Sequence, residues 1–266
     1  MAEPVLRWPG SKWRLSDWIV SRIPPHEVYV EPFFGSGAIF FSKKPSETET
    51  INDLDGNVVN LFKTIRENSL ELAALIEMTP WSRAEYNYVR DNEPTGDPLE
   101  DARRFLVRCW QGFGAKTSCR TGWAFDRTGT VYKPQLWQKL PKRILDIADR
   151  LKNAQIECLP GVELIKEHNR KNTLIYVDPP YIVSTRRNSK LYAIEMGEEK
   201  QHIELLTALN NHQGPAIISG YPSKLYSDAL EGWEMHTNKA RTEKGIAATE
   251  VIWLNPKAAM YTGGLF

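Results

Sequence analysis

The sequence predicts an α/β fold in which helices cover both faces of a doubly wound, mostly parallel sheet. Segments 28–30, 174–177 and 216–219 are short and apolar, which is typical of strands buried on both faces. Segments with helical spacing of apolar residues lie between strands, and strands that alternate with helices usually pair in parallel. A length of 266 residues with 41% hydrophobic residues indicates one large domain, or one domain that carries an insertion.

The N-terminal part contains two predicted strand–helix units. Residues 12–23 have helical spacing, and the two prolines that follow them end the helix. A strand over 28–30 then leads through a glycine-rich turn at 35–37 into an apolar helix start. A second strand over 48–52 precedes a long segment, 57–78, with helical periodicity.

The same pattern returns in the C-terminal part. The strand at 174–177 is followed by a helix over 199–211, a strand over 216–219 and a last strand over 250–255. With the two strands of the N-terminal part, the sequence therefore predicts a sheet of five strands.

Residues 103–143 differ from the rest of the chain in charge. They contain ten basic residues and one acidic residue, so the local balance is 10 − 1 = +9, although the whole chain carries only +1. Aromatic residues are interleaved with four glycines, which predicts a loop-rich basic module; we expect Trp110, Trp123 and Trp137 to belong to the core. We place this inserted module at residues 63–157 and the main domain at residues 1–62 and 158–266.

Several classes of protein are excluded by composition. The three cysteines have no CxxC spacing and the five histidines no metal-binding spacing, so we expect no disulfide framework and no metal. The apolar runs are far shorter than the about 18 residues of a membrane span, and the N-terminus lacks the apolar region of a signal peptide. We therefore expect a cytoplasmic protein with no membrane partner.

The first candidate site is the glycine turn at 35–37, between a strand and a helix. Its glycines let the backbone approach a ligand closely, and a helix start favours negative groups. Asp53 and Asp55 end the next predicted strand, where an acid can accept hydrogen bonds from a ribose. Position 40 is Phe, so the pattern of a dinucleotide site is absent and a shorter adenosine-type ligand fits better. Taken alone, the turn is also compatible with an ordinary strand–helix connection.

The second candidate site is Asp178-Pro179-Pro180-Tyr181, directly after the strand at 174–177. Tandem prolines remove two N–H donors, so the backbone presents carbonyl groups at the end of the strand. The Asp178 carboxylate and the Pro179 carbonyl can both accept hydrogen bonds from one exocyclic NH₂ group. Two acceptors draw that nitrogen towards tetrahedral geometry and make it nucleophilic, while Tyr181 can stack on the attached ring. A bare DPP turn is common on protein surfaces, but its place after a buried strand favours the functional interpretation.

The order of these motifs resembles that of the Dam-type DNA adenine-N6 methyltransferases, the D12 class, over nearly the whole chain. Asp178 to Tyr181 match the catalytic motif of the family without departure, and the basic insert occupies the place of its target-recognition domain. The other similar segments are RWPGSK at 7–12, the FxGxG loop at 30–37, the acidic strand end at 52–55 and a base-pocket motif at 218–222.

The resemblance implies a Rossmann-like methyltransferase fold and transfer of a methyl group from S-adenosylmethionine to adenine N6 in double-stranded DNA. The target nitrogen is inaccessible in a stacked duplex, so the family also implies base flipping. The implied catalytic residues are Asp178, Pro179, Pro180 and Tyr181, and the implied donor-binding residues are Trp8, Lys12, Phe33, Gly35, Gly37, Asp53 and Asp178. For DNA contacts we select Arg7, Lys116, Arg120, Arg127 and Lys133, although each could equally be a solvated surface charge. The basic loop at 186–190 is a further candidate for closing over the base.

Other functions remain open at this stage. The same turn can serve cytosine N4, and an RNA base or a protein glutamine poses the same chemical problem. Outside enzymes, the chain could be a DNA-binding regulator with a vestigial pocket. The sequence does not give the recognition site; we expect a monomer.

Overall fold

The computed structural model describes residues 3–115, 121–125, 132–182, 194–241 and 247–261. The strands are β1 (Val28–Glu31), β2 (Thr48–Asn52), β3 (Ala154–Glu157), β4 (Thr173–Val177), β5 (Ala216–Gly220), β6 (Glu234–Arg241) and β7 (Ala247–Leu254). The helices are α1 (Ser16–Val20), α2 (Ala38–Ser42), α3 (Gly56–Glu67), α4 (Ser69–Met78), α5 (Arg83–Asp91), α6 (Pro98–Gln111), α7 (Lys133–Gln138), α8 (Leu140–Leu151), α9 (Gly161–Glu167), α10 (Glu199–Asn210), α11 (Lys224–Ala229) and α12 (Pro256–Ala259), with a short 3₁₀ turn, η1 (Phe113–Ala115).

The strands form one sheet in the order β3-β2-β1-β4-β5-β7-β6. Strands β3, β2, β1, β4 and β5 are parallel, and β7 pairs antiparallel with both β5 and β6. The order reverses between β1 and β4, which is where a doubly wound sheet binds its ligand. The predicted mostly parallel sheet and Rossmann-like methyltransferase fold are confirmed.

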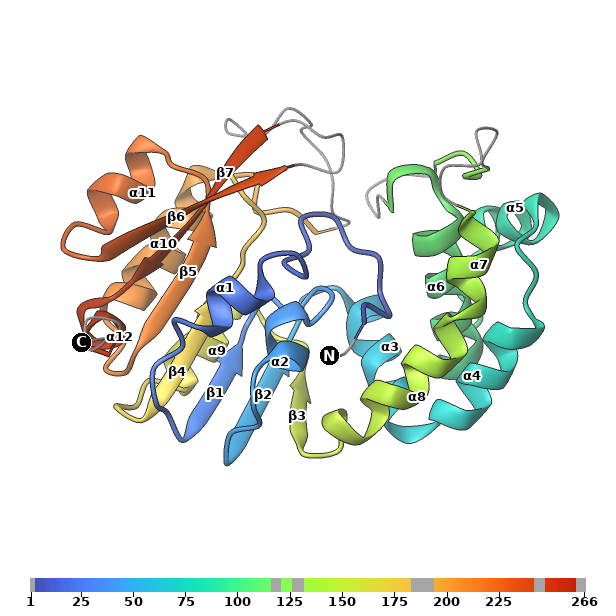
Figure 1. The fold of residues 1–266 in the computed structure, drawn as a ribbon, viewed down its shortest axis with the longest axis horizontal. Helices are drawn as coiled ribbons and strands as arrows, with labels where there is room; N and C mark the ends of the chain where they lie inside the picture. Colours follow the sequence, from blue (N-terminus) through green and yellow to red (C-terminus); the bar gives the residue numbers. More distant parts are fainter. Residues whose placement is uncertain (1–2, 116–120, 126–131, 183–193, 242–246, 262–266) are drawn as a thin grey trace.

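Helices cover both faces of the sheet, as Figure 1 shows. Along β4, Leu174 and Tyr176 belong to one buried cluster and Ile175 and Val177 to another, because successive side chains of a strand point to opposite faces. The first cluster includes residues of α1, α2, α3 and α12, and the second includes residues of α9, α10 and α11. All four β4 residues named are 0% exposed, which explains their uninterrupted apolar pattern.

Four element predictions need correction. The helix expected over 12–23 is only α1, because residues 13–15 before it and 21–22 after it form turns. The helix expected over 57–78 is divided at Asn68, whose backbone is not helical (φ −136°, ψ 44°), into α3 and α4. The strands β3 and β6 were not expected. Both lie at edges of the sheet, where polar residues are tolerated and the apolar pattern is lost. Residues 154–157 were assigned to the insert at 63–157 from the sequence, but they belong to the sheet as strand β3.

Helices α4 to α8 form a helical body beside the β3 edge of the sheet (Figure 1). Buried Trp110 on α6 and Trp137 on α7 donate their indole N–H groups to the carbonyls of Val5 and Thr79, at 2.8 Å in each case. Both tryptophans are therefore core residues, as expected, while Trp123 is half-buried. The module is less loop-rich than expected, because residues 103–111 and 133–143 are mostly helical.

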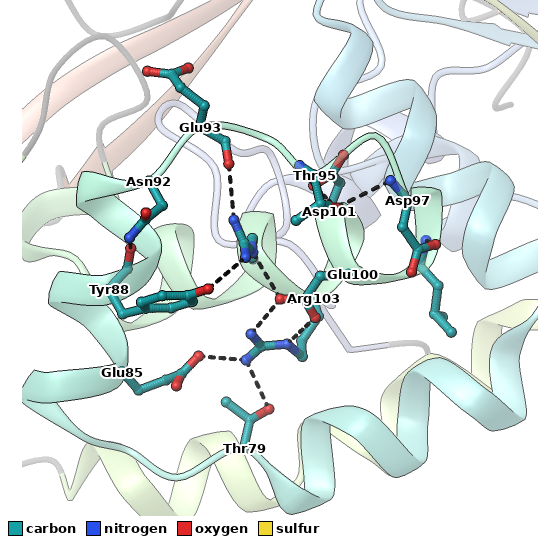
Figure 2. A network of polar contacts seen from close by, with 12 residues as sticks. Thr79, Glu85, Tyr88, Asn92, Glu93, Thr95, Asp97, Glu100, Asp101 and Arg103 are labelled. Carbon is teal, nitrogen blue, oxygen red and sulfur yellow. Dashed lines mark hydrogen bonds and ion pairs between the residues drawn. The ribbon is translucent and has the colours of Figure 1, made fainter.

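The basic character of residues 103–143 is also weaker than the local balance suggested. Arg103 and Arg104 both pair with Glu100, and Arg103 also contacts Glu85 at 2.6 Å (Figure 2). Arg143 pairs with Glu3, and Lys142 pairs with Asp146. These acidic partners all lie outside the window of sequence in which the charges were counted. Four of the ten basic residues are therefore paired with acidic groups. Glu100 and Asp146 lie within one helical turn of their partners, whereas Glu85 and Glu3 are brought to theirs by the fold.

Candidate active site

The carboxyl ends of β1, β2 and β4 meet around one pocket. Residues of the glycine turn, the acidic end of β2 and the turn after β4 line it. Among the residues implied by the family resemblance, Trp8, Lys12, Phe33, Gly35, Asp53, Asp178 and Pro180 line this pocket. Gly37, Pro179 and Tyr181 do not line the pocket, although each of them is directly next in sequence to a residue that does.

The glycine turn is fixed against the end of β2 by one carboxylate. Asp53 accepts hydrogen bonds from the Gly35 N–H through Oδ2 (2.8 Å) and from the Asp55 N–H through Oδ1 (2.9 Å). Burial raises the pKa of Asp53 to about 6, against the effect of these amide donors. Gly35 (φ +49°) and Gly37 (φ +67°) both have left-handed backbones, which explains the two glycines.

The N-terminal segment at residues 8–12 packs against the glycine turn and lines one side of the pocket. A Cβ added to Gly35 would lie 2.7 Å from both Cδ1 and Nε1 of Trp8, so the indole and the backbone are in close contact. Ser11 and Ser36 share a hydrogen bond between their hydroxyl groups at 2.8 Å. These contacts give the sequence motif at 7–12 a definite place: it forms one wall of the pocket.

Asp178 is held by a buried cation from this same segment. Lys12 Nζ lies 2.9 Å from Asp178 Oδ1 and donates to the Gly10 carbonyl at 2.8 Å, while only 5% of the Lys12 side chain is exposed. Burial raises the pKa of Asp178, and the Lys12 ammonium opposes that rise. Lys12 Nζ also lies 4.9 Å from the centre of the Tyr181 ring. The sequence located both residues, but it gave no sign that they pair.

Tyr181 is oriented by residues from two other strands. Its hydroxyl donates to Glu250 Oε2 on β7 at 3.0 Å. Its ring makes an edge-to-face contact with Tyr221, directly after β5, with centroids 4.7 Å apart and planes at 70°. Burial and the nearby Glu250 raise the pKa of Tyr221. The motif at 218–222 therefore reaches the turn after β4.

Glu31 is a pocket residue that the sequence analysis did not select. It ends β1, is 2% exposed and accepts a hydrogen bond from the buried Tyr29 hydroxyl at 2.6 Å. Burial raises the pKa of Glu31 to about 8. Its position at the end of a buried strand, directly before the glycine turn, was the available signal. Ser11, Ser36, Tyr176 and Met196 also line the pocket and were not predicted.

The residues selected for DNA contact are only partly described. Arg7 is half-buried and donates to the Trp110 carbonyl at 3.3 Å, which joins the N-terminal segment to α6. Lys133 is half-buried at the start of α7. Lys116, Arg120, Arg127 and the loop at 186–190 lie outside the described residues.

Within the described part of the chain, no group of three or more His, Cys, Asp or Glu side chains is placed to hold a metal ion. No helix among these residues is long and apolar enough to cross a membrane.

Comparison with known proteins identifies the family. A family model described as D12 class N6 adenine-specific DNA methyltransferase matches residues 8–243. The chain is similar to the DNA adenine methylase of Salmonella typhi, with 23% identity over 89% of this chain and 87% of the relative. It is also similar to the type II methyltransferase M1.LlaDCHI of Lactococcus lactis subsp. cremoris, with 23% identity over 95% of each chain. The DNA adenine methylase of Haemophilus influenzae is 25% identical over 94% of this chain and 92% of its own. The chain belongs to the D12 class N6 adenine-specific DNA methyltransferase family.

Proposed function

We propose that the protein transfers a methyl group from S-adenosylmethionine to adenine N6 at specific sites in double-stranded DNA, by base flipping. The observation that carries this proposal is that Asp178 and Pro180 of the catalytic turn line the same pocket as Gly35 and Asp53. Groups suited to hold a nucleoside and a group suited to activate an amine therefore share one cavity.

The side chains that line the pocket suit the chemistry of the donor. Asp53 can accept hydrogen bonds from ribose hydroxyl groups, and Trp8 and Phe33 offer ring surfaces to an adenine. Glu31 offers a buried carboxyl group to the ammonium group of the methionine part. S-adenosylmethionine supplies a methyl group on a positively charged sulfur. The C–S bond breaks as the bond from the methyl carbon to N6 forms, the sulfur leaves as a neutral thioether, and the amine gives up one proton to solvent. No metal is needed for this transfer.

The chemistry required of the protein is to make an aromatic amine nucleophilic. Asp178 accepts a hydrogen bond from the N6 amino group, and the Pro179 carbonyl offers a second acceptor. Lys12 keeps Asp178 ionised despite its burial, so the carboxylate can act as an acceptor. Tyr181 stacks on the adenine and holds it against the donor.

The target base leaves the duplex at a cost of a few kcal/mol, which stacking and phosphate contacts offset. The helical body is the counterpart of the target-recognition domain, and we assign the DNA contacts of Lys116, Arg120, Arg127, Lys133 and Arg7 to that step. We also propose that the enzyme acts as a monomer in the bacterial cytoplasm, where DNA and the donor are both present.

The test is methyl transfer from labelled S-adenosylmethionine to unmethylated genomic DNA, with separation of the product nucleosides and sequencing of the modified positions. The proposal expects label in N6-methyladenine, its loss in Asp178→Ala, and its retention in Asp228→Ala, an exposed control on α11. Label in N4-methylcytosine would overturn the base assignment but not the mechanism. DNA and donor binding without transfer would indicate a regulator with a vestigial pocket.

A further inference from the structure

We infer that Glu250 is a positioning residue that fixes the two tyrosines around the target base, Tyr181 and Tyr221. The inference rests on the proposed function, because the two rings need a fixed orientation only if a base packs against them. Glu250 does not line the donor pocket, so its role belongs to the side where the base is methylated.

The sheet brings Glu250 to this place. Strand β7 runs antiparallel to β5, with Gly220 opposite Val251, so the residues next to that pair are Tyr221 and Glu250. Tyr181 comes from the neighbouring strand end, after β4. The Glu250 carboxylate accepts the Tyr181 hydroxyl at 3.0 Å, and it lies near enough to Tyr221 to raise the pKa of that hydroxyl. One side chain thus connects three strands of the sheet at its carboxyl edge.

The geometry explains why such a connection is useful. The two rings are nearly perpendicular, at 70°, with centroids 4.7 Å apart. A base that stacks on Tyr181 would then meet the Tyr221 ring at a steep angle, which restricts its position in two directions. A tyrosine after two prolines is anchored at its backbone, but its ring can still rotate unless the hydroxyl is held. A carboxylate suits this purpose because it has only acceptor atoms and can serve two hydroxyl groups.

Glu250 could act by holding the two tyrosines in place or by accepting the proton released from N6. The variant Glu250→Gln distinguishes these two roles. The glutamine oxygen can accept from one tyrosine, and its NH₂ group can donate to the oxygen of the other. Glu250→Gln should therefore keep both rings in place, although it removes the charge. If the carboxylate instead took the proton released from N6, glutamine would be as damaging as alanine.

The experiment compares the parent enzyme with Glu250→Ala, Glu250→Gln, Tyr181→Phe and the double variant Glu250→Ala/Tyr181→Phe. The substrate is a duplex that carries the site mapped from genomic DNA, and a second duplex has 2-aminopurine in place of the target adenine. We expect kcat to fall about tenfold in Glu250→Ala and in Tyr181→Phe, the effect of one hydrogen bond to a charged group. The double variant should be no worse than either single one, and Glu250→Gln should stay within about threefold of the parent.

Two further readouts separate positioning from a general structural effect. The affinity for S-adenosylhomocysteine should stay within about twofold in all variants, while the 2-aminopurine signal of the bound duplex should change in Glu250→Ala. Glu234→Ala, on the neighbouring strand β6, is the matched control and should retain the parental kcat.

The inference would be overturned if the fold losses of kcat in the two single variants multiplied in the double variant. It would also be overturned if Glu250→Gln lost as much kcat as Glu250→Ala. If Glu250→Ala does not fold, Tyr181→Phe still tests the inference. The parental kcat in that variant would contradict a role for the hydrogen bond between Tyr181 and Glu250. Absence of methyl transfer by the parent enzyme would instead overturn the proposed function itself, and with it this inference.

Discussion

Lys12 and Asp178 form a buried ion pair, with Nζ and Oδ1 2.9 Å apart, although 166 positions separate them in the chain. The pair joins the N-terminal segment to the catalytic turn. It also favours the charged form of the turn, because burial raises the pKa of Asp178 and the Lys12 ammonium is the largest influence that lowers it. Removal of one partner from such a pair leaves the other buried and uncompensated.

Substitution of Lys12 should therefore change the pH dependence of the reaction. Asp178 is active when ionised, so kcat falls as the pH drops through its pKa. Lys12→Ala raises that pKa further, so the acid limb of the kcat profile should move to higher pH. We expect kcat at neutral pH to fall about ten- to a hundredfold, and Lys12→Arg to recover part of it. An unshifted acid limb in Lys12→Ala, measured at saturating donor and DNA, would contradict the role of the ion pair.

Gly35→Ala should weaken donor binding. The added Cβ would lie 2.7 Å from Trp8, at a residue whose φ of +49° disfavours any side chain. Backbone strain of this kind costs about 1–3 kcal/mol, so the Kd for S-adenosylmethionine should rise about tenfold or more. Gly56→Ala is the matched control, because no atom lies within 4 Å of its added Cβ. Equal donor affinity in the two variants, measured by calorimetry, would contradict the close approach of Trp8 to the turn.

Donor binding should release a proton through Glu31. With a pKa of about 8, this carboxyl group is mostly protonated at pH 7 in the free protein. An ammonium group placed beside it favours the ionised form, so its pKa falls and a proton leaves. Calorimetry at pH 7 in buffers of different ionisation enthalpy should detect close to one proton released per donor. The release should disappear in Glu31→Gln; if it persists there, another group is responsible.

Arg83 should contribute to DNA binding. Its guanidinium is exposed and lies 5.0 Å and 5.3 Å from the centres of the Trp123 and Phe125 rings, which are themselves stacked. An arginine oriented in this way keeps N–H donors for a phosphate. Helix α5, which begins at Arg83, is at the end of the helical body that lies on the same side as the carboxyl ends of the strands (Figure 1).

Arg83→Ala should weaken duplex binding and lower the slope of log Kd against log salt by about one. Donor affinity should not change. The control is Lys200→Ala, an exposed cation on α10. If both variants bind duplex with the parental salt dependence, Arg83 does not contact a phosphate.

Arg103 should stabilise the helical body rather than bind DNA. Its side chain is 12% exposed and contacts Glu100, Glu85 and Thr79, as Figure 2 shows. Arg103→Ala leaves Glu85 without this partner and Glu100 paired with Arg104 alone, so the free energy of unfolding should fall by about 1.5–3 kcal/mol. Lys142→Ala, which breaks an exposed pair, should leave denaturant unfolding unchanged. A neutral result for Arg103→Ala would mean that the network does not stabilise the fold.

Much of the fold could be read from the sequence because its central strands are buried on both faces. Strands β1, β4 and β5 are continuous apolar runs, whereas the edge strands β3 and β6 contain polar residues and gave no such signal. The basic insert was overestimated for a related reason. Its arginines were visible in the sequence, but the acidic groups that pair with Arg103 and Arg143 lie elsewhere in the chain.

The sequence by itself determined the chemistry that is available: a glycine turn, an acid at the end of the second strand and Asp178-Pro179-Pro180-Tyr181 after a buried strand. Each of these motifs is local, so its residue types and spacing are sufficient to recognise it. Only the tertiary structure decided which groups face one another. The contacts of Asp178 with Lys12 and of Tyr181 with Glu250 join residues 166 and 69 positions apart. No local pattern encodes these contacts, since they exist only where the N-terminal segment and the antiparallel strand β7 are folded against the turn after β4.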